Sequence, residues 1–156
     1  GDAGAAALLA DESLKLKTDD PDAIHLRFSC RLVSGEVASS LQDLETRHGR
    51  RWAEVNRSIQ QIGGQMEREP KEGMLPFERG VLFAHKRNFD RAVEDYTRAI
   101  ERGRRSALAF RAHSRSGLGQ WKEALTDVEV YLAEFPQSPG AAEARALKDE
   151  LQKKAQ

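Results

Sequence analysis

Small and large apolar residues recur in the same order along two neighbouring stretches of the chain. The corresponding positions, at a constant offset of 32 residues, are Gly80 with Ala112, Phe89 with Trp121, Ala92 with Ala124, and Tyr96 with Val128. Within each stretch the apolar residues follow the spacing of a helix and do not alternate as in a strand. A period in the low thirties predicts stacked helical hairpins, because one hairpin cannot bury its apolar face without a neighbour.

The two sizes of residue have different roles in such a hairpin. Small residues, Gly80 or Ala112 in the first helix and Ala92 or Ala124 in the second, allow the two helix axes to approach closely where they cross. Bulky residues fill the space between neighbouring hairpins, as close packing requires. We therefore expect four consecutive helices in residues 73–138, arranged as two neighbouring pairs.

The predicted turn inside each hairpin contains a residue that tolerates a positive φ angle. Gly119 holds this position in the second stretch and Gly35 in an earlier, weaker one, whereas Asn88 holds it in the first stretch. Glycine ends a helix readily in this conformation, and asparagine is its commonest substitute. We expect each of these residues to separate two antiparallel helices.

The same residues resemble the tetratricopeptide repeat, a family whose unit has a small-x2-aromatic signal in its first helix and an Ala-x3-aromatic signal in its second. Residues 73–104 match this pattern at Gly80, Phe83, Ala92, Tyr96 and Ala99. Residues 105–138 match it at Ala112, Gly119, Trp121, Ala124 and Pro136. The chain departs from the family pattern at Arg104, Arg115 and Tyr131. The resemblance implies an all-α fold, a right-handed α-solenoid of tetratricopeptide-like helical hairpins with a C-terminal capping helix.

We expect one solenoid with three parts. Residues 1–50 form a degenerate N-terminal repeat region, residues 51–72 an extra amphipathic helix and hinge, and residues 73–156 two repeats plus the capping helix. The extra helix carries a narrow apolar stripe, which consists of Trp52, Val55, Ile59, Ile62 and Met66. Two interpretations remain open: a core helix on the flank of the array, or a detachable helix that occupies a groove in this chain or in a second copy.

Charged residues make up 32% of the 156-residue chain and balance at 25 of each sign, so the net charge is zero. Five arginines gather near the second repeat: Arg102, Arg104, Arg105, Arg111 and Arg115. They indicate either a solvated face with salt bridges or contacts to an acidic partner. Because no aromatic residues interleave with them, we expect no nucleic-acid binding. No apolar run is long enough to span a membrane.

Residues with catalytic or metal-binding chemistry are scattered. The four histidines, His25, His48, His85 and His113, show no spacing that would place two ligands on one helical face, and there is no Gly-rich phosphate loop. The single cysteine, Cys30, is interpreted as a small buried hydrophobe. We therefore predict neither an enzyme nor a bound cofactor or metal.

The resemblance implies that the first helix of each hairpin lines a concave, peptide-binding groove. The groove positions are Met74, Phe77, Glu78, Val81, His85, Ala109, Phe110, His113 and Ser116. The predicted function is a protein–protein interaction scaffold that binds a peptide or helix of a partner protein. The alternative is a self-assembling element that oligomerises through residues 52–66 or through opposed charged ends. If Phe77 and Phe110 line the groove, their replacement by alanine should remove partner binding with little loss of helicity.

Overall fold

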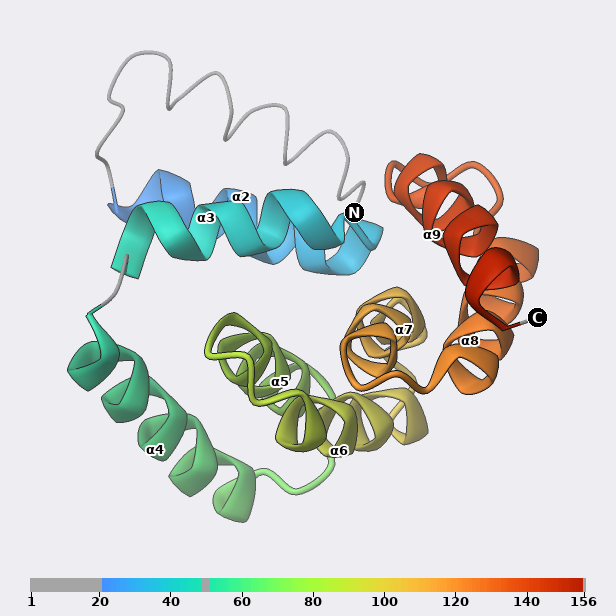
Figure 1. Ribbon diagram of the computed structural model, residues 1–156. Helices are drawn as coiled ribbons and strands as arrows, with labels where there is room; N and C mark the ends of the chain where they lie inside the picture. The colour runs from blue at the N-terminus through green and yellow to red at the C-terminus, as the bar shows by residue number, and fades with distance from the viewer. Residues whose placement is uncertain (1–20, 49–50, 156) are drawn as a thin grey trace.

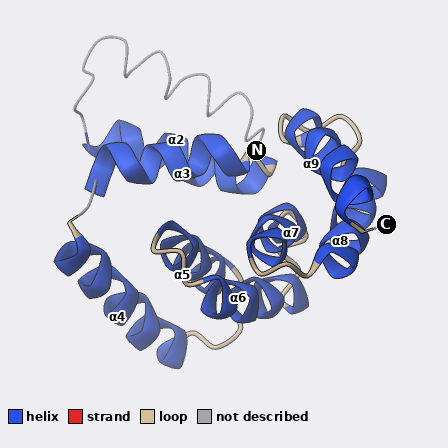
Figure 2. Ribbon diagram, viewed as in Figure 1, coloured by secondary structure: helices blue, strands red, loops and turns tan. Residues whose placement is uncertain are grey.

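The computed structural model describes residues 21–48 and 51–155. Within these ranges it contains eight α-helices and no strand, as Figure 2 shows. The helices are α2 (Pro21–Ser34), α3 (Val37–His48), α4 (Trp52–Arg68), α5 (Met74–His85), α6 (Phe89–Glu101), α7 (Ala107–Gly117), α8 (Trp121–Glu134) and α9 (Ala141–Lys154). The all-α prediction is confirmed for the described residues, including the four helices of residues 73–138. Residues 1–20 and 49–50 of the predicted N-terminal repeat region lie outside the described residues.

Helices α4 to α9 form an arc in which each helix packs on the next (Figure 1). Helices α4, α6 and α8 lie along the outside of the arc, whereas α5 and α7 lie inside it. Helices α2 and α3 pack on each other as a separate hairpin, and α3 contacts α4, α5 and α7. The N-terminal hairpin therefore crosses the inner face of the arc instead of extending the array at its end.

The close crossing predicted within the first repeat is present between α5 and α6. A Cβ atom at Gly80 would lie 2.7 Å from Cε1 of Tyr96, closer than a side chain permits. Ala92, its counterpart Ala124, and Ala112, which is the counterpart of Gly80, are completely buried. The small residues thus mark the places where helices meet, as close approach of helix axes requires.

The turns agree with the prediction at the glycines and differ at Asn88. Gly35 and Gly119 have φ angles of 78° and 75°. Between α5 and α6 the residue with positive φ is Arg87, at 60°, and the prediction for Asn88 was wrong by one position. The Asn88 side chain instead accepts a hydrogen bond from the Arg91 amide at 3.4 Å and caps α6. An asparagine oxygen suits this role because the first amides of a helix have no partner inside the helix.

Each hairpin contains the same buried ion pair, which the sequence analysis missed. The arginine Nε atom of the first helix donates to an aspartate 16 residues later in the second helix. These bonds join Arg27 to Asp43 at 2.8 Å, Arg79 to Asp95 at 2.7 Å and Arg111 to Asp127 at 2.9 Å. The three aspartate side chains are only 1%, 1% and 4% exposed. The hairpin α2–α3 therefore shares a structural unit with α5–α6 and α7–α8, although it lies elsewhere in the fold.

A second arginine supports each of the three aspartates. Arg31 contacts Asp43 at 2.9 Å and Arg115 contacts Asp127 at 2.7 Å, both from the first helix of their hairpin. In the middle hairpin the second contact comes instead from Arg98, in the same helix as Asp95, at 3.0 Å. Planar guanidinium groups suit this arrangement because they donate to both oxygens of one carboxylate.

Candidate functional site

Three of the predicted groove residues lie in the core of the protein. Phe77 and Val81 are 0% exposed and Phe110 is 1% exposed. The ring of Phe77 meets those of Phe110 and Tyr96 edge to face, with centroids 5.0 and 6.0 Å apart. The inner face of α5 and α7 is thus packed at these positions, and their side chains offer no exposed surface to a ligand in this structure.

The other predicted groove residues have mixed positions. Met74, Glu78 and Ser116 are half-buried. The His85 side chain lies 3.7 Å from the Glu45 carboxylate of α3, and its ring centroid is 5.5 Å from that of Trp52. These contacts join the end of α5 to both α3 and α4. Ala109 and His113, both in α7, are the two predicted residues that line a pocket.

The turn between α2 and α3 docks against α8 and the start of α9. The Tyr131 hydroxyl donates to the Ser34 carbonyl at 3.0 Å, and the Gly140 amide donates to the same carbonyl at 3.2 Å. One turn further, the Ala38 amide donates to Oε2 of Glu143 at 3.0 Å. Glu143 thus caps the start of α3 from another helix. These hydrogen bonds attach the N-terminal hairpin to the end of the arc that α8 and α9 form.

The contact between the α2–α3 turn and the segment that precedes α9 leaves no room for a side chain at Gly140. A Cβ atom there would lie 2.3 Å from the carbonyl oxygen and 2.5 Å from the carbonyl carbon of Gly35, which are backbone atoms. We expect Gly140→Ala to lower the free energy of unfolding by about 1–3 kcal/mol, the usual effect of overpacking. Urea denaturation followed by circular dichroism measures this change, and hydrogen exchange in α3 should accelerate.

Gly64 in α4 provides the matched control for Gly140. A Cβ atom at Gly64 would meet nothing within 4 Å. Gly64→Ala should therefore stabilise the protein by about 0.5–1 kcal/mol, because alanine is the better helix former. A loss of stability for Gly140→Ala together with a gain for Gly64→Ala would support the docking of the hairpin, whereas a neutral Gly140→Ala variant would contradict it.

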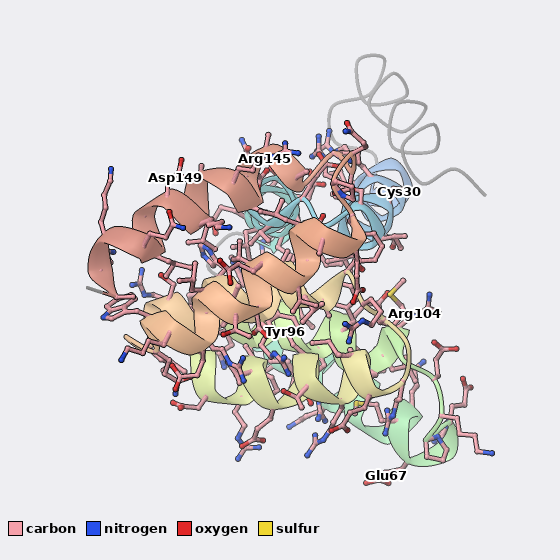
Figure 3. All side chains as sticks on the ribbon, turned by 90° about the vertical axis from the view of Figure 1, so that its right-hand side faces the viewer. Cys30, Glu67, Tyr96, Arg104, Arg145 and Asp149 are labelled. Carbon is pink, nitrogen blue, oxygen red and sulfur yellow. The ribbon has the colours of Figure 1, made fainter. Side chains whose placement is uncertain are left out.

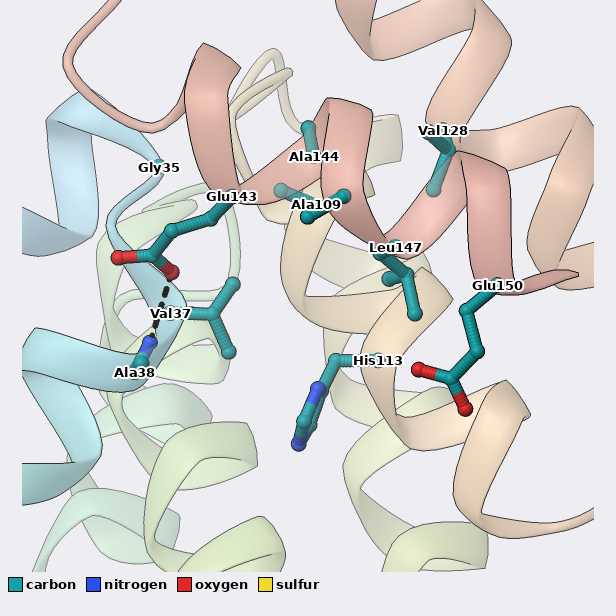
Figure 4. A pocket seen from close by; sticks show the side chains of 11 residues that line it. Gly35, Val37, Ala38, Ala109, His113, Val128, Glu143, Ala144, Leu147 and Glu150 are labelled. Carbon is teal, nitrogen blue, oxygen red and sulfur yellow. Dashed lines mark hydrogen bonds between the residues drawn. The ribbon is translucent and has the colours of Figure 1, made fainter.

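A pocket of about 320 Å³ remains open where α3, α7, α8 and α9 meet (Figure 4). Its lining is mostly apolar and includes three ionisable side chains. The lining residues are Gly35, Val37, Ala38, Ala109, His113, Val128, Glu143, Ala144, Ala146, Leu147 and Glu150. The volume lies at the lower end of the range of small-ligand sites. It suits one side chain or a small molecule better than a whole helix.

His113 lies between the two carboxylates of the pocket. Surrounding protein atoms desolvate its ring and lower the pKa of His113 below its ordinary value, while Glu143 and Glu150 act in the opposite direction. Desolvation is the larger of these effects, and it disfavours the charged form of the ring. The acidic groups of the pocket lining are Glu143 and Glu150.

The five arginines predicted to contact an acidic partner all have partners within the chain. Arg102 donates to the Glu72 carbonyl at 3.3 Å, and Arg104, labelled in Figure 3, donates to Oε1 of Glu72 at 3.3 Å. Arg105 binds Glu134 at 3.0 Å and lowers the pKa of that carboxyl. Arg111 and Arg115 both bind Asp127. Four of the five arginines thus form salt bridges within the chain, and Arg102 donates to a backbone carbonyl.

The predicted amphipathic helix, α4, packs on the flank of the arc. Val55 is completely buried, and Ile59 and Ile62 are partly buried against the core. Met66 is half-buried, whereas Trp52 at the start of the helix remains 41% exposed. The stripe thus contacts α5 in this structure, as the flanking-helix interpretation expects.

Among the described residues, no group of three or more histidine, cysteine or acidic side chains is placed to hold a metal ion. No helix in the described part of the chain is both long and apolar enough to cross a membrane. Comparison of the chain with protein-family models, curated proteins and solved structures found no match. The arrangement of side chains on the inner face is therefore the basis for a functional proposal.

Proposed function

We propose that this protein is a right-handed α-solenoid of tetratricopeptide-like hairpins that binds a segment of a partner protein on the inner face of its arc. Three hairpins with the same Arg–Asp pair support the assignment as a repeat protein. The pattern of small residues at Gly80, Ala92, Ala112 and Ala124 agrees with it. The proposed function is binding alone, without catalysis, cofactor or metal.

The observation that carries this proposal is the open pocket at Ala109 and His113. Repeat scaffolds bind ligands on their curved inner surfaces, and the α2–α3 hairpin packs on that surface at α5 and α7 and leaves a pocket between its own turn and α9. The partner segment would therefore contact the inner face at α7 and α9. The start of α3 would lie next to this partner segment.

A photo-reactive amino acid placed at the mouth of the pocket tests this function. Ala146 is exposed and lines the pocket, so benzoylphenylalanine at this position should cross-link a partner in an extract of the source cell. The matched control carries the same group at Ala133, which is exposed on α8 and does not line the pocket. A partner captured from position 146 and not from 133 supports the proposal. Identical products from both positions, or none from either, contradict it.

A further inference from the structure

The pocket beside α9 combines an apolar floor with a negative rim. Its floor consists of Val37, Ala109, Val128, Ala144 and Leu147. Glu143 and Glu150 stand on the rim two turns apart in α9, with Leu147 between them (Figure 4). The described residues that line the pocket include no lysine or arginine. An apolar floor under two carboxylates is complementary to a ligand with an aliphatic body and a cationic end.

The two glutamates already have partners within the chain, and both carboxylates can still accept further hydrogen bonds. Glu143 accepts the Ala38 amide through Oε2, and an ionised carboxylate has about four acceptor sites. Glu150 pairs with Lys154 one turn later, at the exposed end of the helix. Such exposed pairs contribute little and exchange easily. The Lys154 ammonium also lies 4.8 Å from the centre of the Trp121 ring, which is not part of the pocket.

We propose that this pocket accepts a lysine or arginine side chain of the partner segment. The aliphatic stem would lie on Ala109, Ala144 and Leu147, and the cation would lie at the rim, beside the carboxylate of Glu143 or of Glu150. Long basic side chains bury their stems on apolar surface while the charged end meets an acceptor. This inference rests on the proposed function and adds the chemistry of the residue that the inner face selects.

Four small probes, each with a chain of four carbon atoms, test the selection directly. N-butylguanidinium, butylammonium, n-butanol and butyrate are titrated into the full chain, and ¹⁵N chemical shifts are followed at Ala109, Ala144 and Leu147. We expect both cations to give saturable shifts at these residues and to bind about two- to fivefold more tightly than butanol, as expected for partly exposed ion pairs. Butyrate should bind most weakly, because the rim repels it.

Glutamine variants separate the charge from the shape of the pocket. Glu150→Gln and Glu143→Gln should each weaken the binding of the two cations and leave the binding of butanol unchanged. The Glu143→Gln side chain keeps a carbonyl oxygen for the Ala38 amide, so the hairpin should stay docked. Glu129→Gln is the control, since Glu129 pairs with Lys148 and does not line the pocket.

The outcomes distinguish this inference from the proposed function. Equal affinities for butanol and the cations, or cation binding that is insensitive to both glutamine variants, would overturn the selection of a basic side chain. The absence of saturable shifts for every probe would show that the pocket binds no such ligand. In either case, cross-linking from Ala146 tests partner binding independently, because it does not depend on which side chain enters the pocket.

Discussion

Replacing Asp127 with alanine is expected to lower the free energy of unfolding by about 3–5 kcal/mol, the effect of breaking a buried ion pair by removing one partner. The Asp127 side chain is 4% exposed and accepts hydrogen bonds from both Arg111 and Arg115. Its loss leaves two guanidinium groups, 14% and 21% exposed, without their carboxylate. Urea denaturation followed by helical circular dichroism measures the change.

The control for Asp127 is the ion pair between Arg105 and Glu134. Both side chains are substantially exposed, at 41% and 35%. Glu134→Ala should therefore cost less than about 1 kcal/mol, as exposed salt bridges do. If the two alanine variants unfold at the same urea concentration, the repeated Arg–Asp pair does not stabilise the hairpins as we infer.

Replacing Phe77 with alanine is also expected to cost about 3–5 kcal/mol, because a buried aromatic side chain is removed and a cavity remains. Its ring packs edge to face on Phe110 and Tyr96 at the centre of the α5, α6 and α7 contacts. The resemblance implied a different result, a loss of binding with little loss of helicity. The structure instead places the ring where it supports the fold, and thermal and urea unfolding measure the difference.

Two further variants make the Phe77 experiment decisive. Phe77→Leu retains most of the apolar volume and should cost less than about 1.5 kcal/mol. Val33→Ala alters a side chain that is 44% exposed and should change stability by no more than about 0.5 kcal/mol. A Phe77→Ala protein with unchanged stability that no longer binds its partner would restore the groove interpretation for this residue.

Local features of the fold could be predicted because they depend on neighbouring residues. The spacing of Gly80, Ala92 and Tyr96 identified which helix faces meet, and the structure has the close crossing there. Gly35 and Gly119 identified two turns through their φ angles. The constant separation of 16 residues between arginine and aspartate was also visible, but it was not recognised, because neither residue type marks a buried position unless its partner is known.

The candidate site was predicted only in part. Ala109 and His113 were expected on the inner face through the resemblance, whereas Glu143, Leu147 and Glu150 belong to the helix that was expected only to cap the array. Phe77 and Phe110 were expected at the groove because the resemblance assigns these positions of the first helix to it. The family pattern identifies the apolar face of a helix. It does not identify which surface covers that face.

The sequence by itself therefore determined the helices, their order, the close crossing of α5 and α6 and two of the turns, since these follow from short-range spacing and from the φ preferences of single residues. Only the tertiary structure decided that the α2–α3 hairpin crosses the inner face and that a pocket with two carboxylates remains beside α9. That choice depends on contacts such as the bond from Gly140 to Ser34 and the capping of α3 by Glu143. Those residues are about a hundred positions apart, and no local pattern relates them.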